Sequence, residues 1–232
     1  MDRNLKFLEK CANEELLTLT NMLVYDPKDH KERFSESLTK TKEWSRYYPN
    51  NIKGFLPLVE KEYLFYGGNS IANWFRGHGV SYKEVLYDVC KQLKVNFNKN
   101  SSVDLIESYL LQKVLIDTID KMNEEEIKGM CGAQTKDAIK KELKSMNQKL
   151  ITQLSIGLAI NLAARWGVRQ GVMVAGRLAA AGAGLAIPFV NAALVIWAVL
   201  DVMFSVTGPA YRVTVPATLY IASLRRVYSM ME

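Results

Sequence analysis

The sequence predicts an all-α fold: a helical bundle with a C-terminal Gly/Ala-rich apolar helical hairpin. Apolar residues recur at spacings of three and four along most of the chain, which is the period of an amphipathic helix. No run of alternating β-branched residues is long enough for a sheet, except for a short stretch at residues 211–215. With 232 residues, the chain is long enough to bury a core and could form one large domain or two small ones.

We expect three consecutive segments along the chain. Residues 1–50 are predicted to form an N-terminal helical module, residues 51–148 a central helical domain, and residues 149–232 the apolar hairpin with a C-terminal helix. The division follows a change in composition, because charged residues are frequent before position 149 and scarce after it.

The N-terminal module has two helix starts that are easy to identify and one weaker candidate. Asp2 can cap a short first helix, and Asn13 can cap a second one with acidic residues in its first turn, where the helix dipole favours them. Phe34 and Leu38 are spaced four apart within a polar stretch, which favours a third helix.

The central domain is organised around residues 67–82, where tight turns separate three short helices. Gly67 and Gly68 end one helix, since glycine tolerates the left-handed conformation found after helix C-termini. Ser81 and Glu84 form a capping box for the helix that follows. As a binding or structural motif we select Gly67, Gly68, Asn69, Ser70, Asn73, Trp74, Arg76, Gly77, His78, Gly79 and Tyr82, with Asp88 on the next helix.

Each chemical interpretation of this motif has a structural alternative. His78 could act as a general base with Asp88 or Cys90, but a turn histidine that makes a local hydrogen bond is commoner. The N–H groups at residues 67–70 could hold an anion, although the stretch lacks the other features of a phosphate-binding loop. Arg76 and Asp88 could instead form an ion pair that locks two helices together.

Three further helices precede the apolar segment. Residues 101–104 cap a long helix, and Asn123 opens another with three glutamates in its first turn. Residues 135–150 form a Lys-rich pattern that predicts a surface helix leading into the apolar rear of the chain.

The apolar rear could contact a membrane. Residues 178–200 are 23 residues without a charge, and as a straight helix they would span about 34 Å, enough for a bilayer core of about 30 Å. Pro188 and Asn191 favour a bent hairpin over a simple span, and the weak lipophilicity of Ala and Gly leaves burial inside the protein as the alternative. The residues predicted to contact lipid are Ile187, Phe189, Val190, Leu194, Val195, Ile196, Trp197, Val199 and Leu200.

Charge and cysteine content narrow the expected partners. The net charge is +6, and residues 150–232 carry six arginines against two acidic residues, a balance that suits anionic head groups. The lysines near position 140 are interrupted by acids, so we expect no nucleic-acid partner. The three cysteines are far apart, so we expect reduced thiols, no metal and no cofactor. We also expect a cytoplasmic protein, because the N-terminus does not resemble a signal peptide.

Two motifs and a short N-terminal stretch carry a family resemblance. The first motif comprises Tyr66-Gly67-Gly68-Asn69-Ser70-Ile71-Ala72-Asn73, Arg76-Gly77-His78-Gly79, Tyr82 and Asp88-Val89-Cys90-Lys91-Gln92-Leu93-Lys94. The second, which adds Tyr211, Arg212, Arg225 and Arg226 to the candidate residues, comprises residues 210–217 and 223–226. With residues 4–11, they resemble the bacterial YaaW family of uncharacterised proteins, which is distantly similar to ubiquinol–cytochrome c chaperones. That resemblance implies a helical, non-enzymatic protein that works at a membrane.

We therefore expect a non-enzymatic, membrane-associated helical protein whose hairpin is able to insert or form a pore. The expected partner is membrane lipid or a membrane protein client, and the expected location is the bacterial cytoplasm, peripherally or integrally associated with the inner membrane. The alternative is a soluble assembly chaperone or protein-binding module with a groove beside Trp74 and His78. An enzyme that uses His78 is the third possibility.

Overall fold

The computed structural model describes residues 1–67, 80–131, 134–166, 193–205 and 210–230. Over these ranges the chain forms ten α-helices and three short 3-10 helices, and its only β-type pairing is an isolated bridge between Tyr25 and Glu32. The all-α prediction is confirmed. Residues 211–215, the one stretch that suggested a strand, form the first turns of a helix.

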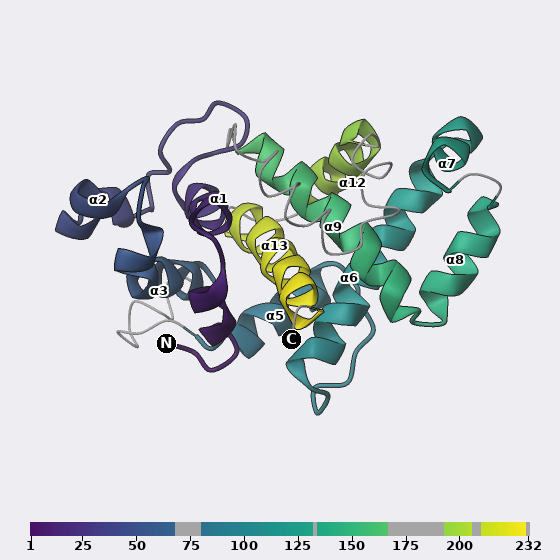
Figure 1. Cartoon of the computed structure of the whole chain (residues 1–232), viewed down its shortest axis with the longest axis horizontal. Helices are drawn as coiled ribbons and strands as arrows, with labels where there is room; N and C mark the ends of the chain where they lie inside the picture. Colours follow the sequence, from purple (N-terminus) through teal and green to yellow (C-terminus); the bar gives the residue numbers. More distant parts are fainter. Residues whose placement is uncertain (68–79, 132–133, 167–192, 206–209, 231–232) are drawn as a thin grey trace.

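The helices follow one another in the order shown in Figure 1. They are α1 (Asn13–Val24), α2 (Lys42–Tyr47), α3 (Leu56–Tyr66), α5 (Tyr82–Gln92), α6 (Val103–Lys121), α7 (Glu124–Cys131), α8 (Lys136–Lys144), α9 (Gln148–Arg165), α12 (Ala193–Ser205) and α13 (Tyr211–Ser229). The 3-10 helices are Lys6–Lys10, Leu38–Lys40 and Ile52–Phe55.

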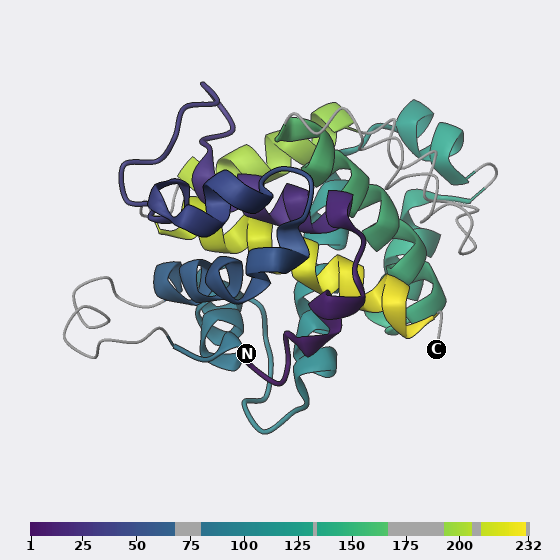
Figure 2. The ribbon, with the colours of Figure 1, turned by 60° about the vertical axis from the view of Figure 1, so that its left-hand side comes forward.

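Helices α9 and α13 lie side by side at the centre of the molecule (Figures 1 and 2). Nearly every residue of α9 from Leu150 to Ala163 is buried, and the same holds for α13 from Val213 to Leu224. A helix that is apolar on all sides must be surrounded by protein or lipid, and here protein surrounds both. Residues 150–163, which carry no charge, are therefore part of the protein core.

A single hydrophobic core runs from Leu5 to Val227 and takes residues from all three predicted segments. Polar contacts cross the same boundaries: the Tyr63 hydroxyl lies 2.7 Å from Thr218 Oγ1, and the Tyr228 hydroxyl donates to Glu15 at 2.6 Å. The divisions at positions 50 and 148 thus do not separate independent cores.

Helix starts largely follow the sequence signals. The Ser81–Glu84 capping box is present at α5, and the Asp2 carboxylate adds a second cap by accepting the Tyr82 N–H at 2.9 Å. At α1 the cap differs from the prediction, because Ala12 precedes the helix and its N–H donates to Glu15 at 2.8 Å.

One predicted helix is absent and another is shorter than predicted, both for local reasons. Residues 28–37 are irregular, because Asp26 and Asp29 accept backbone N–H groups two residues onward and form turns. Phe34 is consequently fully exposed, whereas Leu38 is buried. The Lys-rich helix ends at Lys144, and a left-handed residue, Met146 with φ 59°, separates it from α9.

Gly67 lies at the end of α3 and packs closely against α5. Its φ is −75°, so the left-handed conformation expected at this glycine pair is not found at Gly67. A Cβ atom at this position would lie 2.2 Å from Cγ2 of Val85, so a side chain there would prevent α3 and α5 from packing this closely. Gly68 lies outside the described residues.

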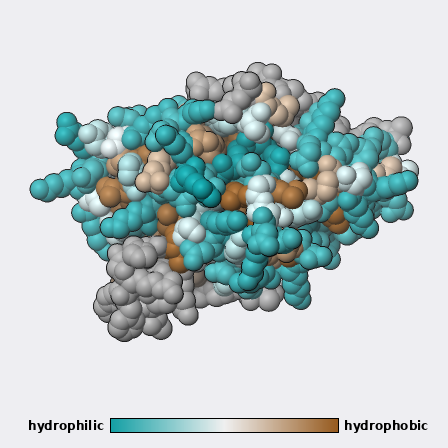
Figure 3. Space-filling model, turned by 90° about the horizontal axis from the view of Figure 1, so that it is seen from below, coloured by the Kyte–Doolittle hydropathy of each residue, from teal (hydrophilic) through white to brown (hydrophobic). Residues whose placement is uncertain are grey.

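Among the described residues, no helix combines the length and the apolar character that crossing a bilayer requires. The face seen from below Figure 1 is mainly hydrophilic among its described residues, with small hydrophobic patches (Figure 3).

Candidate functional site

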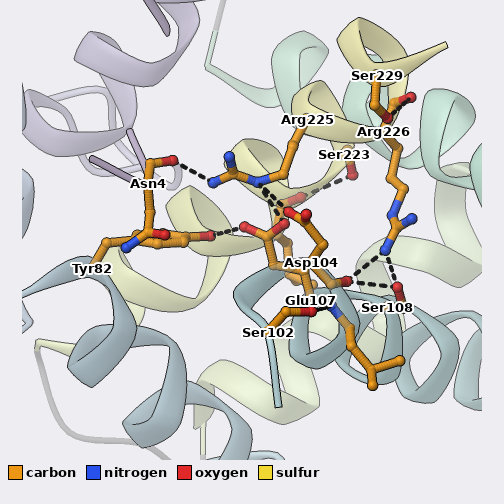
Figure 4. A network of polar contacts seen from close by, with 12 residues as sticks. Asn4, Tyr82, Ser102, Asp104, Glu107, Ser108, Ser223, Arg225, Arg226 and Ser229 are labelled. Atoms are coloured by element: carbon orange, nitrogen blue, oxygen red, sulfur yellow. Dashed lines mark hydrogen bonds and ion pairs between the residues drawn. The ribbon is translucent and has the colours of Figure 1, made fainter. Parts of the chain in front are cut away.

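A buried glutamate, Glu107 of α6, joins three segments that are far apart in the sequence (Figure 4). Its side chain has no exposed surface, and its Oε2 accepts a hydrogen bond from Arg225 Nε at 2.8 Å. Its Oε1 accepts the hydroxyl proton of Tyr82, and Arg225 Nη2 also donates to the backbone oxygen of Asn4 at 2.5 Å. The structure therefore brings together Tyr82 and Arg225, one from each sequence motif.

Burial and charge pairing act in opposite directions on this network. Burial raises the pKa of Glu107, against the pull of Arg225 and the Tyr82 hydrogen bond. Burial is the largest single influence on Arg225 and lowers its pKa, but the charge and hydrogen bond of Glu107, with Tyr82 and Asp104, together outweigh burial, so that pKa is raised. Burial also raises the pKa of Tyr82 well above its usual value, so the phenol stays neutral and acts as a donor. The network is a buried ion pair completed by a neutral hydroxyl.

A small cleft of about 320 Å³ lies beside this network. Arg226 is held at its edge, with Nη1 donating to Gln148 at 3.0 Å and Nη2 donating to the Asp104 backbone oxygen at 2.6 Å. The Arg225 guanidinium stacks 4.4 Å above the Phe7 ring. The lining residues are Phe7, Asp104, Arg225, Arg226, Tyr228 and Ser229.

The network is suited to holding helices together and poorly suited to catalysis. Both oxygens of Glu107 are already bonded and shielded from solvent, so the carboxylate cannot exchange a proton with a substrate. Burial raises the pKa of the Cys90 thiol to about 12, which keeps it neutral and unreactive. Among the described residues, no group of three His, Cys, Asp or Glu side chains could hold a metal ion.

A second, larger hollow lies between the end of α6 and α12. It has a volume of about 810 Å³, and its apolar wall comes from one face of α12. Val202 is 63% exposed beside it. The lining residues are Asp117, Asp120, Lys121, Val195, Ala198, Val199 and Val202, and we call this hollow the α6/α12 groove.

The charges at the rim of the groove are mostly paired. Asp117 pairs with Lys113 one turn earlier in α6, and Asp120 pairs with Lys140 of α8. Within the described part of the chain, the structure shows no ion pair for Lys121, which is exposed. The groove thus offers an apolar wall with a cation at its rim.

Aromatic and charged contacts attach α12 to the end of α9. Arg165 lies 4.4 Å above the Trp197 ring and 3.3 Å from the Asp201 carboxylate. The Trp166 and Trp197 rings are 6.3 Å apart, and the Trp166 indole N–H donates to the Tyr25 backbone oxygen at 3.0 Å. These contacts fix which face of α12 points inward.

The residues predicted to contact lipid divide accordingly. Ile196, Val199 and Leu200 are buried against the protein, while Val195 and Trp197 are half-buried. Exposed Val202 was not predicted, because hydropathy identifies an apolar segment but not its outward face. Ile187, Phe189, Val190 and the Leu194 side chain lie outside the described residues, so their lipid contact stays a prediction.

Much of the first motif also lies outside the described residues. Asp88 pairs with Lys91 at 3.2 Å, and its predicted partner Arg76 is not described. Arg212 lies at the exposed start of α13, beside half-buried Tyr211. The motif residues that the structure does not describe are Gly68, Asn69, Ser70, Asn73, Trp74, Arg76, Gly77, His78 and Gly79.

Sequence reasoning missed Glu107, the central residue of the network. A signal existed, because Glu107 falls on the same helical stripe as Leu110, Leu111 and Val114, all of them buried. An acidic residue within an apolar stripe implies a buried partner, but the sequence does not reveal that the partner is Arg225.

Comparison with known proteins identifies relatives over the whole chain. The family model "Domain of unknown function (DUF3944)" matches residues 1–34. A UPF0174 protein from Helicobacter pylori is 33% identical over 236 residues, which cover 97% of this chain and 91% of that protein. The UPF0174 protein YaaW of Escherichia coli is 34% identical over 239 residues, which cover 100% of this chain and 97% of that protein. The chain belongs to the UPF0174 family. No solved structure matches it.

In this UPF0174 protein, the stretches that carry the family resemblance meet at one place. Asn4 lies within the segment matched by the N-terminal domain model, Tyr82 belongs to the first motif, and Arg225 belongs to the second. The resemblance to the YaaW family is confirmed. The more distant similarity to ubiquinol–cytochrome c chaperones stays a prediction.

Proposed function

We propose that the chain is a non-enzymatic helical protein that associates with the cytoplasmic face of the bacterial inner membrane through α12. The observation that carries the proposal is the α6/α12 groove, where an apolar wall and the exposed side chain of Val202 face outward. Water-exposed apolar side chains gathered around a hollow are typical of a docking surface.

The distribution of charge supports a lipid partner. The chain carries a net charge of +6, and Lys121 stands at the rim of the groove. Cations near a bilayer are attracted to anionic lipid head groups, and the attraction weakens as salt screens it. The apolar wall suits the hydrocarbon region of a membrane, and the nearby lysine suits the layer of anionic head groups above it.

A non-enzymatic role agrees with the chemistry of the buried groups. Glu107 is fully engaged in a structural ion pair, and both described cysteines, Cys11 and Cys90, are buried with pKa values raised by that burial. These three side chains therefore offer a substrate neither a proton donor nor a nucleophile.

Vesicle sedimentation tests the proposal. We expect the full chain to bind phosphatidylglycerol vesicles, more weakly at high salt, and Val202→Asp to weaken binding at least about tenfold, because it removes apolar area and adds a charge. Met230→Asp is the matched control, since Met230 is 51% exposed at the far end of α13. Release of a dye trapped in the vesicles would show that binding proceeds to insertion or pore formation.

Equal vesicle binding by the wild type and the Val202→Asp variant would reject α12 as the docking element. The alternative is that the groove holds an apolar helix of a membrane protein client, as expected for an assembly chaperone or protein-binding module. The groove volume of about 810 Å³ is large enough to accept side chains of such a helix. That alternative would appear as a crosslink from position 202 to one client protein without any affinity for vesicles.

A further inference from the structure

Helices α3 and α13 run antiparallel, which places the end of α3 beside the start of α13. At one end, Glu60 accepts the Asp2 N–H at 2.5 Å, and Arg225 donates to nearby Asn4. In the middle, the Tyr63 and Thr218 hydroxyl groups are 2.7 Å apart. The last turn of α3 therefore lies against the first turn of α13, far from the Glu107 network.

Arg33 is buried at this junction with most of its hydrogen-bonding capacity unused. Its side chain is only 10% exposed, and an ion pair joins Nη1 to Asp26 Oδ2 at 3.3 Å. In the described part of the chain, Nε and Nη2 are buried and have no hydrogen-bond partner. A buried guanidinium that lacks acceptors on two of its nitrogens is costly, and a bound anion would remove that cost.

The neighbouring groups favour a bound anion. The Tyr66 hydroxyl, at the end of α3, lies 3.3 Å from Ser35 Oγ. Arg212 is exposed at the start of α13. The pKa of Arg33 is lowered, mainly by burial and further by the positive charge of Arg212. The junction therefore combines two guanidinium groups with two hydroxyl groups.

The nearby acids other than Asp26 contact donors other than Arg33. Both oxygens of Glu62 accept from Ser37, from its N–H at 3.0 Å and from its hydroxyl at 2.5 Å. The Glu36 carboxylate likewise accepts from the N–H and the hydroxyl of Thr39. Asp29 pairs with Lys31 at 3.7 Å, which leaves Asp26 as the carboxylate that contacts Arg33.

We propose that Arg33, Arg212 and Tyr66 form a binding site for a tetrahedral oxyanion, the phosphate group of a lipid head group or of a free phosphate compound. Arg33 supplies the paired Nε and Nη2 donors that match two oxygens of such a group. Arg212 and the Tyr66 hydroxyl supply donors from other elements, so the donors do not lie in the plane of one guanidinium. The positive end of the 19-residue helix α13 strengthens the attraction.

The loop that carries Arg33 can open to admit the anion. Residues 28–32 and Phe34 are exposed, and Phe34 makes so little contact with the rest of the protein that its exposure is 103%. A loop with few buried apolar contacts moves at low cost, so residues 28–32 and Phe34 can shift and expose the Nε edge of Arg33, while the bond from the Arg33 N–H to the Val24 oxygen, 2.7 Å long, holds the Arg33 backbone in place.

Calorimetric titration of the full chain with inorganic phosphate at constant ionic strength tests the site. We expect saturable binding that Arg212→Gln weakens at least about tenfold, and Arg212 is exposed, so this variant folds. Arg33→Lys keeps the charge but removes the paired donors and is expected to weaken binding similarly. Arg46→Gln, at an exposed arginine of α2, is the matched control and should bind normally. Absent phosphate binding, or equal binding by wild type and Arg212→Gln, would overturn the proposal.

A vesicle experiment identifies the source of the phosphate group. If a lipid head group is the ligand, Arg212→Gln weakens binding to phosphatidylglycerol vesicles as well as to free phosphate. If a free phosphate compound is the ligand, that variant loses phosphate binding alone. The phosphate site does not depend on the proposed membrane role of α12. Val202→Asp should leave phosphate binding unchanged, so the phosphate site and the membrane role can be rejected separately.

Discussion

The Glu107 network and the α6/α12 groove combine polarity and exposure in opposite ways. In the network, an acid, an arginine and a tyrosine are buried and bonded to one another. In the groove, apolar side chains of α12 line a hollow, and one of them, Val202, is 63% exposed. Tyr82 and Arg225, which belong to the sequence motifs, thus stabilise the fold, whereas we propose the apolar surface of α12 as the docking surface. Exposure decides between structure and function here, and residue type does not.

The largest effect is expected where the buried charge pair is broken. Glu107→Ala leaves the Arg225 guanidinium with the more distant Asp104, at 3.4 Å, as its carboxylate and removes the acceptor of the Tyr82 hydroxyl, which should lower the free energy of unfolding by about 3 kcal/mol. Urea unfolding followed by circular dichroism measures the change. Glu125→Ala, at an exposed glutamate of α7, is the control, with an expected change within about 0.5 kcal/mol. Equal stability of the two variants would mean that the network does not hold the helices together.

A smaller loss is expected where α3 and α5 approach most closely. Gly67→Ala places a methyl group against Val85 and should cost about 1–3 kcal/mol of unfolding free energy, because overpacking forces the helices apart. The double variant Gly67→Ala/Val85→Ala should recover part of that loss relative to the sum of the single variants. Strictly additive losses would contradict the steric role of Gly67.

Charge burial at Glu60 should affect how stability depends on pH. Burial raises the pKa of Glu60 above its ordinary value of 4.5, so between pH 4.5 and 7 the folded state binds more protons at this site than the unfolded state. Its contribution to stability therefore falls as pH rises through that range. Denaturant unfolding at pH 5, 6 and 7 should show a flatter dependence for Glu60→Gln than for the wild type. A steeper one would contradict the burial of this carboxyl.

The smallest effect is expected at the contact that attaches α12 to α9. Arg165→Gln removes both the stacking on Trp197 and the ion pair with Asp201, and it should cost about 0.5–1 kcal/mol. Asp201→Asn removes the ion pair alone and should cost less. Tryptophan emission during urea unfolding reports both changes. Equal losses would assign the attachment to the ion pair alone.

Local features of this fold could be predicted from the sequence, and contacts between distant residues could not. The Ser81–Glu84 cap depends on neighbours within one turn, so a short stretch of sequence contains all the information it needs. The partnership of Glu107 with Arg225 joins residues 118 positions apart and is decided by the packing of α6 against α13. At Phe34 the sequence predicted a helix that does not form. Its spacing from Leu38 is helical, but turns capped by aspartate side chains form there instead.

The same limit applies to the candidate site. Composition identified α12 as part of an apolar segment, but its outward face is set by the packing of Trp197 and Arg165 at the end of α9. Val202 could therefore not be distinguished from buried Ile196 or Leu200 in advance. Arg33 was overlooked because an arginine in a polar loop gives no sign that it will be buried.

An environment-sensitive fluorophore attached at position 202 tests the outward role of α12 most directly. In a Cys131→Ser background, Cys11 and Cys90 are buried, so Val202→Cys and, separately, Met230→Cys can each be labelled selectively. On adding phosphatidylglycerol vesicles, we expect a blue shift of emission from position 202 and none from position 230. No shift at position 202 while the protein sediments with the vesicles would contradict the assignment of α12 as the docking element.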